Sequence, residues 1–145
     1  MAAFSKFNAT AADLMHAVHN LSTSAVVRVM LSNTLPTSSM TTSTDITQIS
    51  SGFGYTGGSL GGSSVALTSS VQTAGVFKLI ASNLVFTAAG GAIGPFRYPV
   101  LYDASTTVVT GPLLGWWDYG SSISLNDTET LTLTIDPTSG LLQLS

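Results

Sequence analysis

The sequence predicts an all-β protein, an antiparallel β-sandwich or jelly roll in a single domain, with one short helix and an N-terminal arm. Short segments in which apolar and polar residues alternate recur along the chain. The clearest is 130–136, where Leu131, Leu133 and Ile135 share one face. Glycine, proline, serine and asparagine separate these segments, as turns require. At 145 residues, the chain fits one domain.

The N-terminal segment, 1–24, has two interpretations. Its apolar residues recur at intervals of three and four, which is the spacing of a helix. Asn8 and Thr10 are weak helix formers, so an extended arm followed by a strand near 14–19 fits equally well. The segment is interpreted as an arm and first element that precede the main domain.

The β-sandwich domain is expected to cover 25–145. Its first strand is predicted at 25–31, where three valines form a β-branched run. Thr44, or the serine before it, is expected to begin one short helix over 44–49. Segment 50–64 contains six glycines, which predict a long, mobile surface loop without packing side chains.

The rest of the chain is predicted to form strands joined by tight turns. The expected strands are 65–71, 76–81, 84–88, 97–102, 113–118, 131–135 and 141–144. Turns are predicted at 82–83 and 90–95. At 136–140, proline presets one dihedral angle and glycine permits a positive φ, so the last strand is expected to return antiparallel.

The chain is poor in charge. Only 8% of its residues are charged, where about 25% is usual, while serine and threonine number 41. A net charge of −3 without a basic cluster argues against nucleic-acid binding. The absence of cysteine excludes disulfides and cysteine-ligated metals, and no cofactor is expected. The charge-free stretch 79–96 alternates and contains glycine and proline, so no membrane partner is expected.

Two glycine motifs match patterns from enzymes and nucleotide-binding proteins. Residues 57–61 fit the G-x-S-x-G nucleophile elbow, which needs a strand before the serine, a helix after it and a later histidine. Both histidines precede Ser59. Residues 52–57 fit G-x-G-x-x-G, but no strand is predicted before them and no helix after them. Both are interpreted as chance matches within a glycine-rich loop.

Titratable residues also give no catalytic pattern. Asp13, His16 and His19 are spaced three apart and could offer one oxygen and two nitrogens to a metal from one helix face. Two ordinary histidines are the preferred interpretation. A glycosidase-like carboxylate pair would come from acids near strand ends, namely Asp103, Asp118, Asp127 and Glu129. No pattern singles out two of them, so no enzymatic activity is expected.

Adjacent tryptophans, Trp116 and Trp117, lie on a predicted strand, so one is expected in the core and one facing outward. An outward Trp117 beside Asp118 and Tyr119 could anchor a protein partner or stack on a sugar. Protein contact is the preferred interpretation.

Several segments together resemble one group of proteins. They are VVRVMLSNTLPT, STDITQIS, GFGYTGG, VFTAAGGAIGPFRYPVLYD, GPLLGWWDYGSSISL and TLTLTIDPTSGLLQL, and they extend over most of 14–145. These segments resemble small virion structural proteins of tailed bacteriophages. The resemblance implies a head decoration, or cement, protein on the capsid exterior, made in the cytoplasm of the host bacterium. The N-terminal arm is less typical of the group.

The resemblance implies two partners, the major capsid protein and further copies of this chain, which are expected to form a homotrimer. The composition agrees, because a surface with few charges suits burial in a lattice. The alternative is a phage tail or host-recognition module that binds cell-surface glycan through an outward aromatic residue. The residues expected at interfaces are Phe4, Phe7, Phe53, Tyr55, Arg97, Trp117, Asp118 and Tyr119.

Two of these expectations are specific. Residues 1–12 are expected to reach a neighbouring subunit, because chain ends are mobile unless packed and Phe4 and Phe7 show no pattern for docking on their own domain. Arg97 and Asp118 are expected to form an ion pair between subunits.

Overall fold

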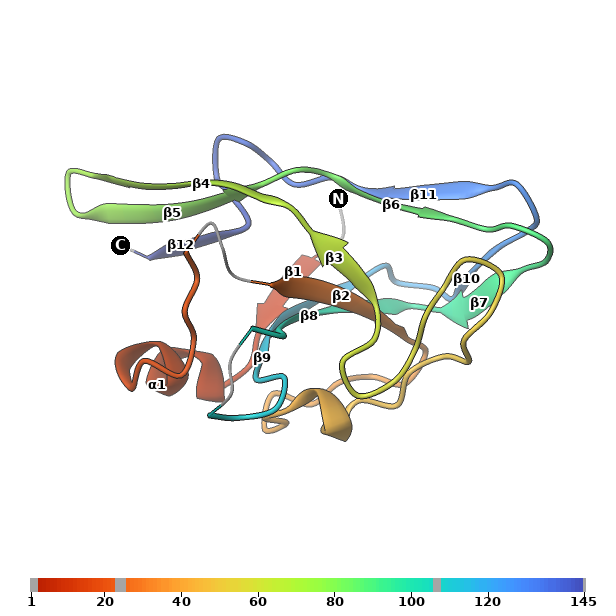
Figure 1. Ribbon diagram of the computed structural model, residues 1–145, viewed down its shortest axis with the longest axis horizontal. Coiled ribbons are helices and arrows are strands. Elements are labelled where there is room, and N and C mark those ends of the chain that lie inside the picture. The colour runs from red at the N-terminus through yellow and green to blue at the C-terminus, as the bar shows by residue number, and fades with distance from the viewer. Residues whose placement is uncertain (1–2, 23–25, 106–107, 145) are drawn as a thin grey trace.

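Two layers of antiparallel strands make up the fold (Figure 1). The computed structural model describes residues 3–22, 26–105 and 108–144. The first two residues of the predicted arm, and residues 23–25, where the first predicted strand begins, lie outside these ranges. Antiparallel strands dominate and the one α-helix among the described residues is short, so the predicted all-β class is confirmed.

The elements follow one another in chain order as β1 (Ala3–Lys6), α1 (Ala9–Met15), β2 (Val27–Ser32), the 3-10 turn η1 (Ser43–Asp45), β3 (Ser63–Val65), β4 (Leu67–Thr73), β5 (Val76–Ala81), β6 (Leu84–Thr87), β7 (Ile93–Phe96), β8 (Tyr98–Asp103), β9 (Leu113–Asp118), β10 (Ile123–Leu125), β11 (Thr130–Leu133) and β12 (Leu142–Leu144).

The lower layer in Figure 1 is a five-stranded sheet with the order β1-β9-β8-β2-β3. Above it lie the three-stranded sheet β12-β5-β4 and the pair β11-β6, and a further pair joins β10 to β7. Only Ala66 separates β3 from β4, so one extended segment pairs with β2 in the lower layer and then with β5 in the upper layer.

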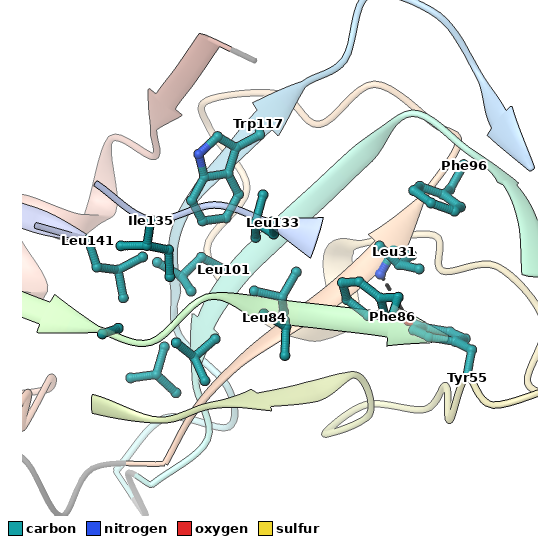
Figure 2. Packing of buried hydrophobic residues seen from close by; sticks show 14 of the residues in the cluster. Leu31, Tyr55, Leu84, Phe86, Phe96, Leu101, Trp117, Leu133, Ile135 and Leu141 are labelled. Atoms are coloured by element: carbon teal, nitrogen blue, oxygen red, sulfur yellow. Dashed lines mark hydrogen bonds between the residues drawn. The ribbon is translucent and has the colours of Figure 1, made fainter. Parts of the chain in front are cut away.

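The main hydrophobic cluster fills the space between the two layers (Figure 2). It is built from residues of both layers, among them Leu31, Leu84, Phe86, Phe96, Leu101, Trp117, Leu133, Ile135 and Leu141. A second cluster covers the opposite face of the five-stranded sheet and consists of Phe7, Met30, Ile46, Tyr98, Val100, Tyr102, Leu113 and Trp116. Both faces of the central strands are therefore covered by apolar side chains and shielded from water.

Burial on both faces corrects the prediction that one tryptophan points outward. Trp116 packs in the second cluster and Trp117 in the main cluster, and each side chain is only 9% exposed. Alternation along β9 does send the two rings to opposite faces. Each of those faces is covered by other parts of the chain, which the local pattern did not indicate.

The N-terminal segment belongs to the domain, so the prediction that it reaches a neighbouring subunit is wrong. Strand β1 pairs antiparallel with β9, with Phe4 opposite Trp117. Phe7 is fully buried, and its ring centroid lies 4.6 Å from that of Trp116. The segment adds an edge strand to the sheet, and its Phe7 fills the second cluster. It therefore packs against its own chain.

Helix α1 follows this strand and corrects the alternative of a strand near 14–19. The helical spacing of the apolar residues indicated the right element, although the helix begins only at Ala9. Thr10 is buried, and its hydroxyl donates a hydrogen bond to the carbonyl oxygen of Leu114 at 2.9 Å. This hydroxyl fixes the helix against β9, which explains a weak helix former in the first turn.

The short helix predicted at 44–49 is a three-residue 3-10 turn. Asp45 Oδ2 accepts hydrogen bonds from the backbone N–H groups of Thr41 and Thr42, both at 2.9 Å, and these lower the pKa of Asp45. The backbone is extended at Ile46, and Gln48 bridges to Ser32. Pairing with the end of β2 therefore stops the helix after one turn.

Strand partners differ from the order that the turns suggested. The junction at 82–83 does not make a hairpin, because β5 pairs with β4 and β12 while β6 pairs with β11. The last strand likewise pairs with β5 rather than with the strand before it. Strand β7 occupies part of the predicted turn at 90–95, and β10 was not predicted.

Phe7→Ala is expected to lower the free energy of unfolding by about 3–5 kcal/mol, because it leaves a cavity among fully buried side chains. Urea denaturation of the purified protein measures this loss. Phe4→Ala is the matched control, since Phe4 lies three residues away but is partly exposed, and it should cost clearly less. Equal stability of the Phe7→Ala variant and the natural protein would contradict the assignment of this segment to the core.

Candidate interaction surface

Phe4 and Trp117 form the wall of an apolar groove. Their ring centroids lie 5.0 Å apart with the planes tilted by 54°, as expected for a favourable aromatic pair. The groove has a volume of about 290 Å³, and Ile135, Asp136 and Leu141 contribute to its other side. Phe4 is 39% exposed, so the groove presents aromatic and aliphatic surface beside the edge strand β1.

Gly115 makes this arrangement possible. A Cβ atom at this position would collide with the ring of Phe4 and with the backbone carbonyl oxygen of Ser5. The glycine lies inside β9, between leucines and tryptophans, where it contributes no side chain to either cluster. Glycine within a strand is a sequence signal for close approach, and here the approaching group is the Phe4 ring.

Arg97 and Asp118 form an ion pair within one chain, which corrects the prediction of a contact between subunits. Arg97 Nε lies 2.7 Å from Asp118 Oδ1, and an Arg97 terminal nitrogen lies 3.0 Å from Asp118 Oδ2. The bidentate contact with Arg97 and the N–H of Gly120 hold the pKa of Asp118 below its ordinary value. Tyr119 N–H donates to the carbonyl oxygen of Arg97, so the pair fastens the end of β9 to the start of β8.

The glycine-rich loop is packed against the domain, contrary to the prediction that it has no packing side chains. Tyr55 is buried in the main cluster, where its hydroxyl accepts a hydrogen bond from the N–H of Leu31 and donates one to Gln48, both at 2.9 Å. Burial raises the pKa of Tyr55 to about 12. At Gly62, φ is +93° and a Cβ would collide with the carbonyl of Val29. Close contact with β2 therefore requires a glycine there.

Phe53 is the exposed aromatic residue of this loop. Its side chain is 52% exposed and lies over Gly91, where a Cβ atom would overlap the ring. The carbonyl oxygen of Phe53 accepts a hydrogen bond from the N–H of Ala89 at 2.9 Å. Phe53 can therefore contact a partner without rearrangement of the loop, whereas the buried Tyr55 and Phe7 cannot.

A buried histidine and two carboxylates meet where the segment after α1 crosses β8. Nδ1 of His19 lies 3.3 Å from Oδ2 of Asp103, and both side chains are fully buried. Nε2 of His19 has no hydrogen-bond partner among the described residues, and Asp13 Oδ2 lies 4.0 Å away. Ser105 donates two hydrogen bonds to the other oxygen of Asp103. The cluster ties residues 84 positions apart in the chain.

Burial alone would raise the pKa of Asp103, yet the hydrogen bonds from His19 and Ser105 outweigh it and leave the pKa lowered. The three residues Asp13, His16 and His19 do not come together as a set, and no group of three possible metal ligands occurs within 3–22, 26–105 and 108–144. Two of the remaining acids support turns. Asp127 accepts from the N–H of Gly90, and Glu129 accepts from the N–H of Asn126.

The two glycine motifs lack the elements that their chemistry needs. Gly52 and Tyr55 form an isolated bridge within a turn, and β3 follows Ser59 where a nucleophile elbow requires a helix. The carbonyl oxygen of Ser59 accepts a hydrogen bond from the Ser43 hydroxyl. In the described part of the chain, no helix is long and apolar enough to cross a membrane.

The predicted interface residues thus do not form one surface. Phe4, Trp117 and Asp118 lie on paired strands at one edge of the five-stranded sheet, and Phe53 lies on the glycine-rich loop. Tyr119 is partly buried against the main cluster, and Phe7 and Tyr55 are buried. Sequence reasoning missed Ile135 and Leu141, which complete the groove. Their apolar character predicted burial, but no local signal indicated that they approach the N-terminal strand.

Comparison of the chain with models of protein families, with curated proteins and with solved structures found no match.

Asp103→Asn is expected to reduce stability at neutral pH by roughly 1.5–3 kcal/mol, because it weakens the hydrogen bonds that the buried carboxylate accepts from His19 and Ser105. Because the pKa of Asp103 is lower in the folded state, its carboxylate stabilises the fold at pH values above the unfolded-state pKa near 3.8. This stabilisation is lost as the pH falls through the lower pKa of the folded state. The variant should therefore lose stability less steeply than the natural protein between about pH 5 and pH 2.

Urea denaturation across this pH range measures both effects. Asp127→Asn is the control, since Asp127 is an exposed acid on a turn. Identical pH slopes for the natural protein and Asp103→Asn would contradict the stabilising role assigned to the buried carboxylate.

Proposed function

We propose that the protein is a structural component of a bacteriophage virion, which binds the outside of the capsid as a decoration protein and stabilises the head lattice. The observation that carries the proposal is an exterior on which apolar side chains are exposed while charged ones are scarce. Large exposed apolar residues include Phe4, Met15, Val26, Leu35, Phe53, Leu60, Val71, Val85 and Leu144. The virion-like segments described above supply the assignment to a phage head.

This exterior favours assembly because it costs little to desolvate. Burying charged side chains at an interface carries a large penalty unless each finds a partner, whereas hydroxyl, glycine and apolar surface can be covered at low cost. Assembled lattices offer such coverage on several sides of each subunit. A protein that binds only the assembled lattice stabilises it by mass action, without any catalytic step.

The groove that Phe4 and Trp117 wall on one side is the contact that we assign to the major capsid protein. Partly buried aromatic residues in a pocket are the usual anchors of protein interfaces. Phe4 is held in place by the pairing of β1 with β9 and by its contact with Trp117. A partner side chain can enter the groove without ordering a flexible arm, which reduces the entropic cost of binding.

Further copies of the chain are the second proposed partner, in a homotrimer. A trimer fits sites of local three-fold symmetry on a lattice, and it would bring three grooves to one site so that weak contacts add. The alternative role in glycan recognition has less support, because the residue expected to stack on a sugar is Trp117 and its side chain is almost completely buried. Stacking on a sugar requires the face of the ring to be accessible.

Purified protein is expected to bind phage heads that lack it and to raise the temperature at which those heads release their DNA. Co-sedimentation measures the binding, and the homotrimer is measured by sedimentation equilibrium of the free protein. Phe4→Ala should weaken binding about tenfold, because it removes one wall of the groove.

Leu35→Ala is the control, since it removes another exposed apolar side chain, 57% exposed against 39% for Phe4, elsewhere on the domain. Circular dichroism would establish that both variants remain folded. Failure of the natural protein to bind heads at micromolar concentration would overturn the proposed function. Equal weakening by both variants would overturn the assignment of the groove.

A further inference from the structure

Strand β4 presents an open edge along its whole length. Among the strands of the described ranges it pairs with β5 only, so no described strand pairs with the backbone groups on its other side. The turn at Ala74 and Gly75, with φ values of 51° and 84°, has the positive angles of a tight hairpin and sets the register of this pair. Figure 1 shows the hairpin of β4 and β5 extending beyond the five-stranded sheet. The edge is therefore accessible to a second strand.

This edge lacks the features that normally prevent strands from pairing between molecules. It has seven residues, whereas the other edge strands in the described ranges have three or four. Strand β1 carries Lys6 and β7 carries Pro95, both of which discourage pairing. No charged residue or proline occurs in β4, and its one irregularity, near Thr68, leaves 69–73 regularly paired.

We propose that β4 pairs antiparallel with β4 of a second copy about a two-fold axis that passes through Val71. In this register Val71 lies opposite its own counterpart, Ser69 opposite Thr73, and Ser70 opposite Gln72. An antiparallel strand is self-complementary under two-fold rotation, so one uncharged edge supplies both halves of the contact. The contact joins the two β12-β5-β4 sheets into one six-stranded sheet.

Side chains favour this register on both faces of the strand. Val71 is 42% exposed, and pairing places two valines in contact across the axis, which is a favourable combination in sheets. Ser69 and Thr73 share the face of Val71, and their hydroxyls can form a hydrogen bond with each other across the strands. Ser70 and Gln72 make the corresponding polar pair on the other face.

Charge does not oppose a second copy of this chain as the partner. Lys78 is the one charged residue on the β12-β5-β4 sheet, and it lies opposite Val71 on β5. In the paired state the two Lys78 side chains are separated by three strand spacings, about 14 Å, which exceeds the screening length at physiological salt. Two negatively charged molecules can therefore meet at this edge without direct repulsion.

An apolar groove on the outer face of the same sheet would become continuous across the axis. The groove has a volume of about 470 Å³, and Val71, Val76, Ile80 and Pro137 contribute its apolar lining. Pairing would place two such grooves next to each other, so that less of their apolar rim is exposed to solvent. The inference rests on the proposed function only for its role on the particle, where the contact would join one trimer to the next.

The chain has no cysteine, so single cysteines can report the register. Val71→Cys places two sulfurs on directly opposed residues, whose Cα atoms are about 4.5–5.5 Å apart and within disulfide range. Mild oxidation of this variant should give disulfide-linked dimers on a denaturing gel. Ser70→Cys places its pair diagonally, about 7–8 Å apart, and should link poorly.

Val85→Cys is the exposure-matched control, since Val85 is 51% exposed on β6 and should not link. Linkage of Ser70→Cys in preference to Val71→Cys would overturn the proposed register. Equal linkage of all three variants would show random collision and overturn the contact. A second pair of variants, Val71→Lys and Val85→Lys, adds one positive charge at each site. Only Val71→Lys should weaken the association of two copies through β4, by severalfold.

The outcomes separate this inference from the proposed function. Selective linkage of Val71→Cys together with no binding to heads would support the strand contact and overturn the capsid role. Normal binding to heads without any selective linkage would overturn the strand contact and leave the capsid role supported.

Discussion

Burial of both faces of β8 and β9 is the constraint on which the rest of the structure depends. Every residue of β8, and all but the last of β9, is buried. A strand buried on both faces needs a packed layer on each side. The strands β5, β6 and β11 supply one layer, and Phe7, Ile46 and their neighbours supply the other. The middle of the sheet therefore requires the N-terminal segment, although the two are far apart in the sequence.

Hydroxyl and amide groups satisfy several buried polar groups in a chain that has few charges. Ser32 donates to the carbonyl oxygen of Thr47 at 2.7 Å, and the Tyr55 hydroxyl satisfies the N–H of Leu31. Asn83 accepts from the N–H of Ile135 where β6 begins and β11 ends. Such neutral contacts carry no ionic desolvation penalty, so the abundance of serine and threonine is compatible with a well-packed interior.

The same strand, β1, completes the core and forms part of the candidate interaction surface. Phe7, just beyond its end, faces the second cluster, while Phe4 within it packs on Trp117 at the boundary of the main cluster. Because Phe4 is anchored from below by Trp117 and Gly115, it presents a fixed apolar surface to solvent. Stability of the N-terminal segment and binding at the groove are therefore linked physically.

Local patterns by themselves determined the fold class and most strand positions. Alternation of period two is a property of neighbouring residues, so β9 was predicted with its observed limits and β11 within two residues. Only the tertiary structure decided which strands pair, that both tryptophans are covered, and that Asp103 meets His19. These outcomes depend on contacts between residues far apart in the chain. Such contacts are selected by how whole layers pack, and the spacing of residues along one segment carries no information about them.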